Sequence, residues 1–232
     1  MGPLPSAPGH FSISLRGQIA RLVPVHRVRL LPACLLLSAG VPPAPGADLW
    51  NGRDFAGWEF VTSPATDLAL VCHATADGAL AAAGRPIGYL ATTAPYASYR
   101  LHVEWRWTEK PGNGGVLVHI ASGPKDRQWP VCFQVQLKAH RAGDVLPMAG
   151  ARCAELPSPA ATQVDKTGGD SEKPAGEWNA CDIVCRGDTI ACSVNGVPQN
   201  RVTGCTPAAG RIGFQFEGAP FELRRLELTL IP

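Results

Sequence analysis

Apolar and polar residues alternate strictly in several short segments of the chain. In 101–107, LHVEWRW, the odd positions hold Leu, Val, Trp and Trp, whereas the even positions hold His, Glu and Arg. Alternation with a period of two places successive side chains on opposite faces of a β-strand. The same pattern recurs in 133–138, FQVQLK, and in 213–218, GFQFEG. These segments are therefore predicted to be strands with one buried face and one polar face.

Turn-forming residues separate the predicted strands. The 232 residues include 25 Gly and 22 Pro, and Asn-Gly pairs stand at 51–52 and 195–196. Asn-Gly favours the tight turns that join antiparallel strands, so 177–199 is predicted to be a hairpin ending in such a turn. The stretch 141–176 is the longest irregular segment, and no helical period or internal repeat is evident. Together these patterns predict an all-β fold, a sandwich of two antiparallel sheets.

The N-terminal segment has a different composition. Residues 1–29 contain four Arg and no Asp or Glu, and 30–41 form the short apolar run LLPACLLLSAGV. A basic stretch followed by a short apolar run and small residues is typical of a secretory signal, and the run is too short to cross a bilayer. We therefore predict a signal peptide and N-terminal extension over 1–47 and one domain over 48–232. This predicts a secreted or periplasmic protein with no membrane association after signal removal.

The composition bears on which partners the protein binds and on the role of its cysteines. The formal net charge is only +2, so nothing indicates nucleic-acid binding. Eight Cys are present without Cys-x-x-Cys or Cys/His metal spacing. In 181–194 the Cys residues share strand faces with Ile and Val, which favours a role as small apolar core residues. A Cys185–Cys192 disulfide is the alternative in an oxidising compartment.

The polar faces of the predicted strands carry unusual residue types. One face consists of His102, Glu104 and Arg106, and others combine Gln with Lys or Glu. His119 is assigned to the same strand face as Leu117. Amide, imidazole and guanidinium groups hydrogen-bond in fixed geometry, which suits an uncharged ligand with many hydroxyls. Such residues predict a carbohydrate site if the separate strands converge on one face.

Loop residues extend this interpretation, and each candidate has a structural alternative. Trp129 lies in a polar loop and is the tryptophan best suited to cover a sugar ring, whereas Trp105 belongs to the core by alternation. Asp144, in AGDV, either shapes a turn or contacts the ligand. The alternative for Glu104 is an ion pair across the sheet, and the alternative for His119 is a buried structural role.

Eight blocks of the sequence resemble, in order, those of the 3-keto-disaccharide hydrolase family. They run from LWNGRDFAGWEF at 49–60 to GRIGFQFEGAPFELRRLEL at 210–228. Between them stand YRLHVEWRW, NGGVLVHI, WPVCFQVQL, AGDV, KPAGEWN and VNGVPQN. The resemblance covers nearly all of 48–232 and implies a concanavalin-like jelly-roll sandwich with a concave sheet face. It also implies an exported bacterial enzyme that hydrolytically cleaves glycosides oxidised to a ketone at sugar carbon 3.

The implied chemistry assigns roles to the polar residues. A ketone at carbon 3 acidifies the hydrogen on carbon 2, so a base removes it, the enolate expels the carbon 1 substituent, and water adds later. A cation, an amide or a divalent metal stabilises the enolate oxygen, although no motif in the sequence requires a metal or another cofactor. The predicted catalytic residues are Glu104, His119 and Glu217. The predicted substrate-binding residues are Arg106, Asn113, Trp129, Gln134, Gln136, Lys138, Asp144 and Gln215.

One departure from the family pattern concerns the base. The family often has Glu-x-Gln where this chain has Gln134-Val135-Gln136. An amide cannot take a proton, so either Glu104 or His119 replaces that carboxylate, or the domain binds a 3-keto sugar without cleaving it. The alternatives to the glycoside-cleaving enzyme are therefore a non-catalytic carbohydrate-binding module and a conventional glucanase-type glycosidase, which needs two close carboxylates.

Overall fold

The computed structural model describes residues 46–126 and 128–232. The predicted signal segment lies outside these ranges except for Gly46 and Ala47, so it stays a prediction. Within the described ranges the helical structure is a single short 3-10 turn, Leu68–Leu70, whose first turn is capped by the Asp67 carboxylate. No helix in this part of the chain is long and apolar enough to cross a membrane.

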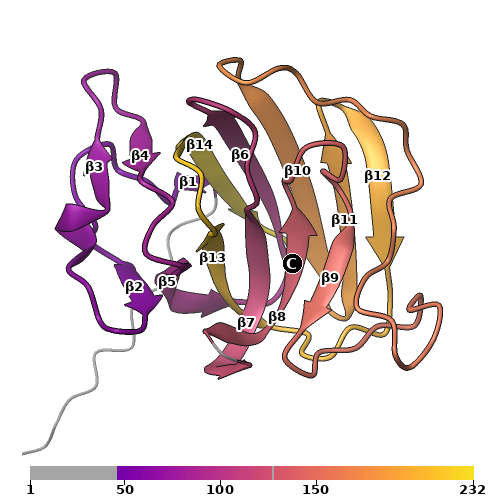
Figure 1. Ribbon diagram of the computed structural model, residues 1–232. Coiled ribbons are helices and arrows are strands. Elements are labelled where there is room, and N and C mark those ends of the chain that lie inside the picture. Colours follow the sequence, from indigo (N-terminus) through magenta and orange to yellow (C-terminus); the bar gives the residue numbers. More distant parts are fainter. Residues whose placement is uncertain (1–45, 127) are drawn as a thin grey trace, which may run out of the picture. The chain divides into compact units, whose positions relative to one another are not determined.

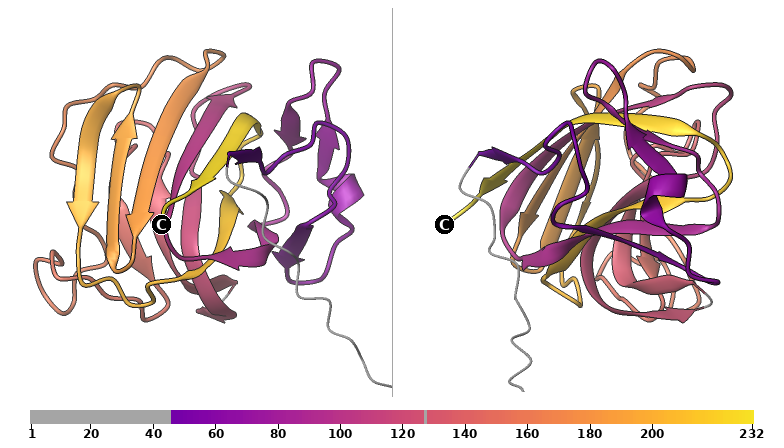
Figure 2. Two further views of the ribbon diagram at one scale, coloured as in Figure 1. Left: turned by 180° about the vertical axis from the view of Figure 1, so that it is seen from behind. Right: turned by 90° about the vertical axis from the view of Figure 1, so that its left-hand side faces the viewer.

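The described strands form two antiparallel sheets that stack face to face (Figures 1 and 2). The prediction of an all-β sandwich is confirmed. The six-stranded sheet has the order β2 (Trp58–Thr62), β5 (Gly88–Tyr96), β13 (Gly210–Phe216), β7 (Gly115–Asp126), β8 (Trp129–Gln136) and β9 (Val145–Met148). The eight-stranded sheet has the order β12 (Val197–Val202), β11 (Thr189–Val194), β10 (Asn179–Arg186), β6 (Tyr99–Trp107), β14 (Phe221–Leu230), β4 (Leu80–Ala82) and β3 (Cys72–Ala74), with β1 (Ala47–Asp48) paired to β14.

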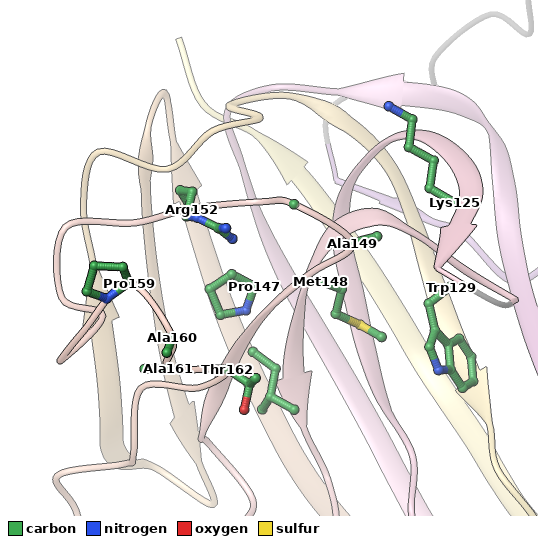
Figure 3. A pocket seen from close by; sticks show the side chains of 12 residues that line it. Lys125, Trp129, Pro147, Met148, Ala149, Arg152, Pro159, Ala160, Ala161 and Thr162 are labelled. Carbon is green, nitrogen blue, oxygen red and sulfur yellow. The ribbon is translucent and has the colours of Figure 1, made fainter.

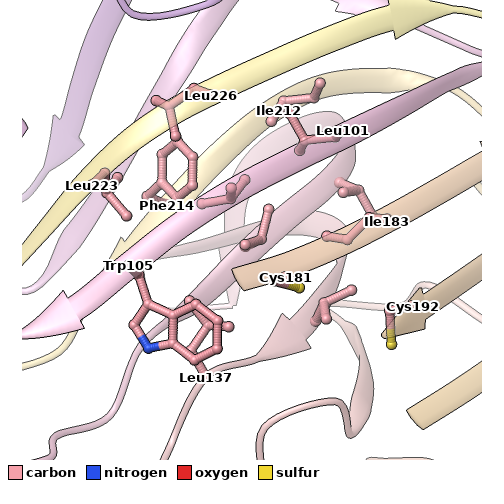
Figure 4. Close-up of a cluster of buried hydrophobic side chains, with 14 of the residues drawn as sticks. Leu101, Trp105, Leu137, Cys181, Ile183, Cys192, Ile212, Phe214, Leu223 and Leu226 are labelled. Atoms are coloured by element: carbon pink, nitrogen blue, oxygen red, sulfur yellow. The ribbon is translucent and has the colours of Figure 1, made fainter. Parts of the chain in front are cut away.

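The core lies between the two sheets and is filled by the apolar positions of the alternating strands. Trp105 of β6 and Phe214 of β13, from opposite sheets, are both almost completely buried, and Figure 4 shows them in one cluster with Ile183 of β10. The alternation therefore predicted the buried face of these strands correctly. Each such side chain stabilises the fold by about 1.5–3 kcal/mol through removal of apolar surface from water.

The Asn-Gly pair at 195–196 forms the predicted turn, between β11 and β12. Both residues have positive φ, 49° for Asn195 and 80° for Gly196, as a two-residue hairpin turn of the primed type requires. The Asn195 side chain also accepts a hydrogen bond from the Ala180 amide and donates one to the Asn179 side chain. The turn thus ties the hairpin to the adjacent strand β10.

Strand β7 departs from the predicted alternation at His119. The register with its neighbours shifts beyond Val118, and His119 has a φ of 55°. This irregularity turns the imidazole into the core, edge-on to Tyr99 and Phe133. The assignment of His119 to the face of Leu117 is therefore wrong, because a bulge inverts the faces of the residues that follow it.

All seven cysteines in the described ranges are buried and unbridged. Within the hairpin, Cys185 lies opposite Ile190 and Cys192 lies opposite Ile183, so the two thiols belong to different cross-strand pairs. Burial raises the pKa of each of these two thiols to about 12. The interpretation as small apolar core residues is confirmed, and the alternative Cys185–Cys192 bridge is not formed.

Candidate functional site

The two sets of polar residues predicted to converge lie on opposite sheets. His102, Glu104 and Arg106 belong to β6 of the eight-stranded sheet, whereas the polar residues of β8 and β13 belong to the six-stranded sheet. Each strand turns its apolar positions towards the shared core. The two polar faces therefore point outwards in opposite directions, and the expected convergence on one face is wrong.

Glu104 is held in an ion-pair network across the eight-stranded sheet. Its Oε2 accepts a hydrogen bond from Nε of Arg224 at 2.5 Å, and its Oε1 accepts one from Nη1 of Arg225 at 3.0 Å. Burial raises the pKa of Glu104, but the hydrogen bonds and charges of the two arginines outweigh burial, and the net shift is downwards. A carboxylate stabilised in this way is a poor base, and the cross-sheet ion pair is the alternative that the structure shows.

Arg106 takes part in the same kind of network. Its guanidinium pairs with Glu222 at 2.6 Å and lies 4.6 Å from the ring centre of Trp178, whose ring also contacts Arg224 at 4.1 Å. His102 pairs with Asp182 at 2.7 Å. Polar contacts across the sheet thus engage His102, Glu104 and Arg106, which explains this face as outer-sheet structure.

A connected row of polar side chains lies instead on the outer face of the six-stranded sheet. Nε2 of Gln134 donates to Oε1 of Gln215 at 2.7 Å and to Oε1 of Gln136 at 3.2 Å. Oε2 of Glu217 accepts hydrogen bonds from Gln215 at 2.7 Å and from Asn113 at 2.8 Å. We call these five residues the amide strip. They are five of the residues that the sequence predicted for the site, drawn from β8, from β13 and the residue that follows it, and from the loop before β7.

Gly115 allows the strip to form. It lies on β7 between β8 and β13, paired with Gln136 on β8. A Cβ atom at this position would come within 2.6 Å of both Cγ and Nε2 of Gln134. Because no side chain stands there, Gln134 reaches across β7 to Gln215. The prediction did not include Gly115, although a glycine inside a strand pattern indicates close approach of other groups.

The direction of the amide groups in the strip follows from its two ends. At one end the Glu217 carboxylate can only accept, so Gln215 presents its NH₂ to Glu217 and its carbonyl to Gln134. At the other end the Gln136 carbonyl accepts the backbone N–H groups of Leu137 and Lys138, at 3.0 and 3.1 Å. Gln134 must therefore donate in both directions. The NH₂ of Gln136 is left out of these bonds and is available to a ligand.

Glu217 is the chemically distinctive residue of the strip. Gln134, Gln136 and Gln215 are buried, whereas Glu217 is partly exposed. Both of its hydrogen bonds end on Oε2, and within 46–126 and 128–232 no side chain donates to Oε1. Partial burial raises the pKa of Glu217, against the opposing effect of the positive charge of Lys138. A carboxylate with a raised pKa and an unoccupied oxygen suits proton transfer.

Two other predicted site residues serve the fold. His119 is fully buried, its Nδ1 lies 3.1 Å from the Pro207 carbonyl oxygen, and burial lowers its pKa. Asp144 is also buried, and its Oδ1 accepts the backbone N–H of Lys166 at 2.8 Å. Burial raises the Asp144 pKa, and Arg141 lies 3.4 Å from its other oxygen. Asp144 thus fastens the irregular segment after β9. Its backbone carbonyl accepts the Gln136 N–H at 2.9 Å, but the side chains of His119 and Asp144 make no hydrogen bond to those of the amide strip.

Trp129 lies on the same sheet face as the strip, beside a pocket of about 630 Å³ (Figure 3). Leu146 and Met148 of β9 also line this pocket. Leu146 lies directly opposite Gln134, and Met148 lies opposite Cys132. Directly opposed residues share a sheet face, so the pocket begins one strand away from the strip. Trp129 is the first residue of β8, so its predicted place in a loop is wrong. Its role as a groove residue stays a prediction, and the other pocket residues were missed.

The described residues also bear on metal binding. Within 46–126 and 128–232 no group of three or more His, Cys, Asp or Glu side chains is arranged to hold a metal ion.

Comparison with known families identifies a relationship over most of the chain. A sequence model of the 3-keto-alpha-glucoside-1,2-lyase-like domain matches residues 46–229. No curated protein matches the chain. The match covers both sheets and every residue of the amide strip.

Solved structures with a similar fold include carbohydrate-active proteins. A candidate glycosyl hydrolase from Parabacteroides distasonis aligns with a TM-score of 0.58 and 16% identity, covering 79% of this chain and 93% of its own. A carbohydrate-binding module from Bacillus subtilis aligns with a TM-score of 0.52 and 12% identity, covering 75% and 95%. The Bacillus licheniformis β-glucanase aligns with a TM-score of 0.53 and 10% identity, covering 82% and 100%. These likenesses confirm the predicted concanavalin-like jelly roll, and with the family match they support a carbohydrate-related function.

Proposed function

The chain belongs to the 3-keto-alpha-glucoside-1,2-lyase-like domain family, and from this premise we propose that it cleaves glycosides oxidised to a ketone at sugar carbon 3, with Glu217 as the general base. The observation that carries the proposal is the Glu217 carboxylate itself. Two amide groups orient it through Oε2, its Oε1 is open, and partial burial raises its pKa. These properties fit a base that accepts a proton from carbon.

The reaction balances with one base. Oε1 of Glu217 takes the proton from carbon 2, and the C–H electron pair becomes the enolate of the carbon 3 ketone. When the enolate collapses, this pair turns the single bond between carbons 1 and 2 into a double bond, and the carbon 1–oxygen bond breaks. The departing oxygen takes a proton from solvent, which leaves an unsaturated keto sugar. Water then adds across the double bond: its hydroxyl bonds to carbon 1, Glu217 returns its proton to carbon 2, and the remaining proton of the water goes to solvent, which completes the hydrolysis that the family resemblance implies.

The enolate oxygen requires a donor, and two groups near Glu217 are suited to this role. Lys138 is exposed, and its positive charge acts on the Glu217 carboxylate. The NH₂ group of Gln136 takes part in none of the hydrogen bonds within the strip, because those bonds use the Gln136 carbonyl oxygen. A cation or amide placed where negative charge develops stabilises the transition state more than the neutral substrate.

The single carboxylate of the strip also distinguishes the proposal from a conventional glycosidase. Retaining glycosidases need two carboxyl groups roughly 5 Å apart. Within the described ranges the strip contains Glu217 and otherwise only amides. A reaction that starts from a ketone-activated C–H bond needs one base, so the chemistry and the residue composition agree.

The test is release of a chromogenic leaving group from a 3-keto-glucoside by the protein and two variants. We expect Glu217→Gln to reduce kcat/KM by about 10²–10⁴-fold, the range for loss of a general base. The matched control is Glu104→Gln on the opposite sheet, which should keep activity within a few-fold of the parent. Circular dichroism checks that both variants fold.

Other outcomes have defined meanings. Loss of activity in Glu104→Gln with retention in Glu217→Gln would contradict the assignment of the base. Binding of the 3-keto sugar without cleavage by the parent protein would favour the carbohydrate-binding module, for which Gln134 in place of an acid is the supporting observation.

A further inference from the structure

The charged side chains described in the pocket beside the amide strip are all cationic. Its lining includes Lys125, from β7, and Arg152, from the segment that follows β9, and no Asp or Glu among the side chains that the structure describes. Neither cation forms an ion pair with a described side chain. Arg152 donates a hydrogen bond from Nη1 to the Ala151 carbonyl at 2.8 Å, which anchors one edge of its guanidinium. The pocket therefore presents two positive charges that none of its described side chains neutralises.

The rest of the pocket is apolar and includes an aromatic ring. Trp129 and Met148 pack on the buried outer-face cluster of Tyr89, Leu117 and Cys132, and both remain partly exposed. Figure 3 shows Met148 between Arg152 on one side and Lys125 and Trp129 on the other. An aromatic ring, or the C–H face of a sugar ring, packs well on an indole and a thioether, because both present extended polarisable surfaces.

The position of the pocket relates it to the reaction site. Gln134 of the strip and Leu146 of the pocket are directly opposed on β8 and β9. Glu217 follows β13, three strand spacings from β9 in the sheet order, which is roughly 14 Å. A single sugar ring at Glu217 does not fill the pocket, but a substituent attached to that ring extends along the same sheet face.

From these observations we propose that the pocket binds a ring that has an apolar face and carries one carboxylate, as the group attached to the oxidised sugar. The ring lies against Trp129 and Met148, and the carboxylate lies between Lys125 and Arg152. An aromatic acid and a uronic acid share this chemistry. The identity of the attached group rests on the proposed function, whereas the acid-binding pocket does not.

A binding experiment without any keto sugar tests the pocket directly. Isothermal titration calorimetry compares 4-hydroxybenzoate with 4-hydroxybenzamide, and glucuronate with glucuronamide, so that each acid has a neutral counterpart of the same shape. We expect one of the acids to bind at least tenfold more tightly than its amide, and the preferred acid identifies the source of the ring. The preference should weaken as salt is added, because the two cations are exposed.

Variants assign the effect to the pocket. In the double variant Lys125→Gln/Arg152→Gln the acid should bind no better than the amide, whereas Trp129→Ala should weaken both ligands of a pair. Arg53→Gln, an exposed cation outside the pocket lining, is the matched control and should keep the preference. Equal binding of acid and amide, retention of the preference in the double variant, or binding of no ligand would each overturn the proposal.

An activity comparison separates this proposal from the proposed function. The ratio of kcat/KM for 3-keto-glucosides with 4-carboxyphenyl and 4-carbamoylphenyl leaving groups should fall at least tenfold in the double variant. Cleavage of both substrates with no effect of the double variant would contradict the acid-binding role of the pocket but not the proposed reaction. Acid-selective binding without cleavage of either substrate would contradict the proposed reaction but not the acid-binding role of the pocket.

Discussion

Glu217 and Glu104 are both partly buried glutamates, but their surroundings shift their pKa values in opposite directions. Glu104 accepts hydrogen bonds from two guanidinium groups, and its pKa is lowered. Glu217 accepts hydrogen bonds from two neutral amides, so burial decides its shift and its pKa is raised. Sequence alternation placed both residues on polar strand faces, and it placed Gln215 beside Glu217 on the same face. It contained nothing about Asn113, Arg224 and Arg225, which come from distant parts of the chain.

The pH dependence of activity follows from the shift of Glu217. The base must be ionised, so kcat/KM should rise with pH through a midpoint above 4.5, the ordinary value for Glu. Lys138→Met removes a positive charge that lowers this pKa, so it should move the midpoint to still higher pH. The pH profile of kcat/KM measures both midpoints, with Glu104→Gln as the control that should not move them. A Lys138→Met midpoint at or below that of the parent would contradict the assignment.

At the scale of the element, strand β7 determines whether the site forms. Its first residue, Gly115, opens the path by which Gln134 meets Gln215, and its irregularity at His119 turns an imidazole into the core. A period of two predicts the faces of a regular strand, and it did so for β6, β8 and β13. It cannot locate a bulge, because the extra residue is accommodated by the pairing with neighbouring strands.

Gly115→Ala should disable the strip while leaving the fold intact. The new Cβ would stand 2.6 Å from Gln134 and 2.8 Å from the Val135 backbone oxygen, so the Gln134 side chain must move, its bond to Gln215 must break, and β8 must shift slightly. We expect a loss of roughly 1–3 kcal/mol in the free energy of unfolding, as for other overpacked sites, together with a fall in kcat/KM. Urea denaturation and kinetics measure the two effects. Gly169→Ala is the control, since its Cβ would meet nothing within 4 Å, and equal behaviour of the two variants would refute this role of Gly115.

At the scale of the whole molecule, the sandwich explains which part of the site could be predicted. The polar residues of β8 and β13 converge because their strands belong to one sheet, whereas β6 belongs to the other. Alternation reports which side of its own strand a residue occupies, and sheet membership depends on long-range pairing. The amide strip was therefore predictable as a set of polar positions, and the exclusion of Glu104 was not. The pocket also escaped prediction, since Lys125 and Arg152 stand in loops or irregular strand ends without a periodic pattern.

The buried imidazole in the core makes global stability depend on pH. The His119 pKa is lowered by burial, so the unfolded chain binds a proton more readily than the folded protein. Stability is therefore fully present above about pH 6.5, the unfolded value, and falls as pH decreases towards the folded pKa, by at most about 1.4 kcal/mol per pH unit. Urea denaturation between pH 7.5 and 5 should show this fall in the parent protein and a smaller one in His119→Phe. His140→Gln, at an exposed histidine, should retain the full dependence, and an identical slope in His119→Phe would refute the argument.

The buried thiols have a practical consequence. A thiol reacts as the thiolate, and burial suppresses that form at Cys132, Cys181, Cys185 and Cys192 by raising each pKa far above the pH of most solutions. Alkylating reagents therefore reach these positions only when the sandwich opens. The rate at which they are labelled therefore measures how often the sandwich opens spontaneously. Mass spectrometry gives this labelling rate separately for each strand that carries a cysteine. Because none of the described cysteines is bridged, this labelling needs no prior reduction of the protein.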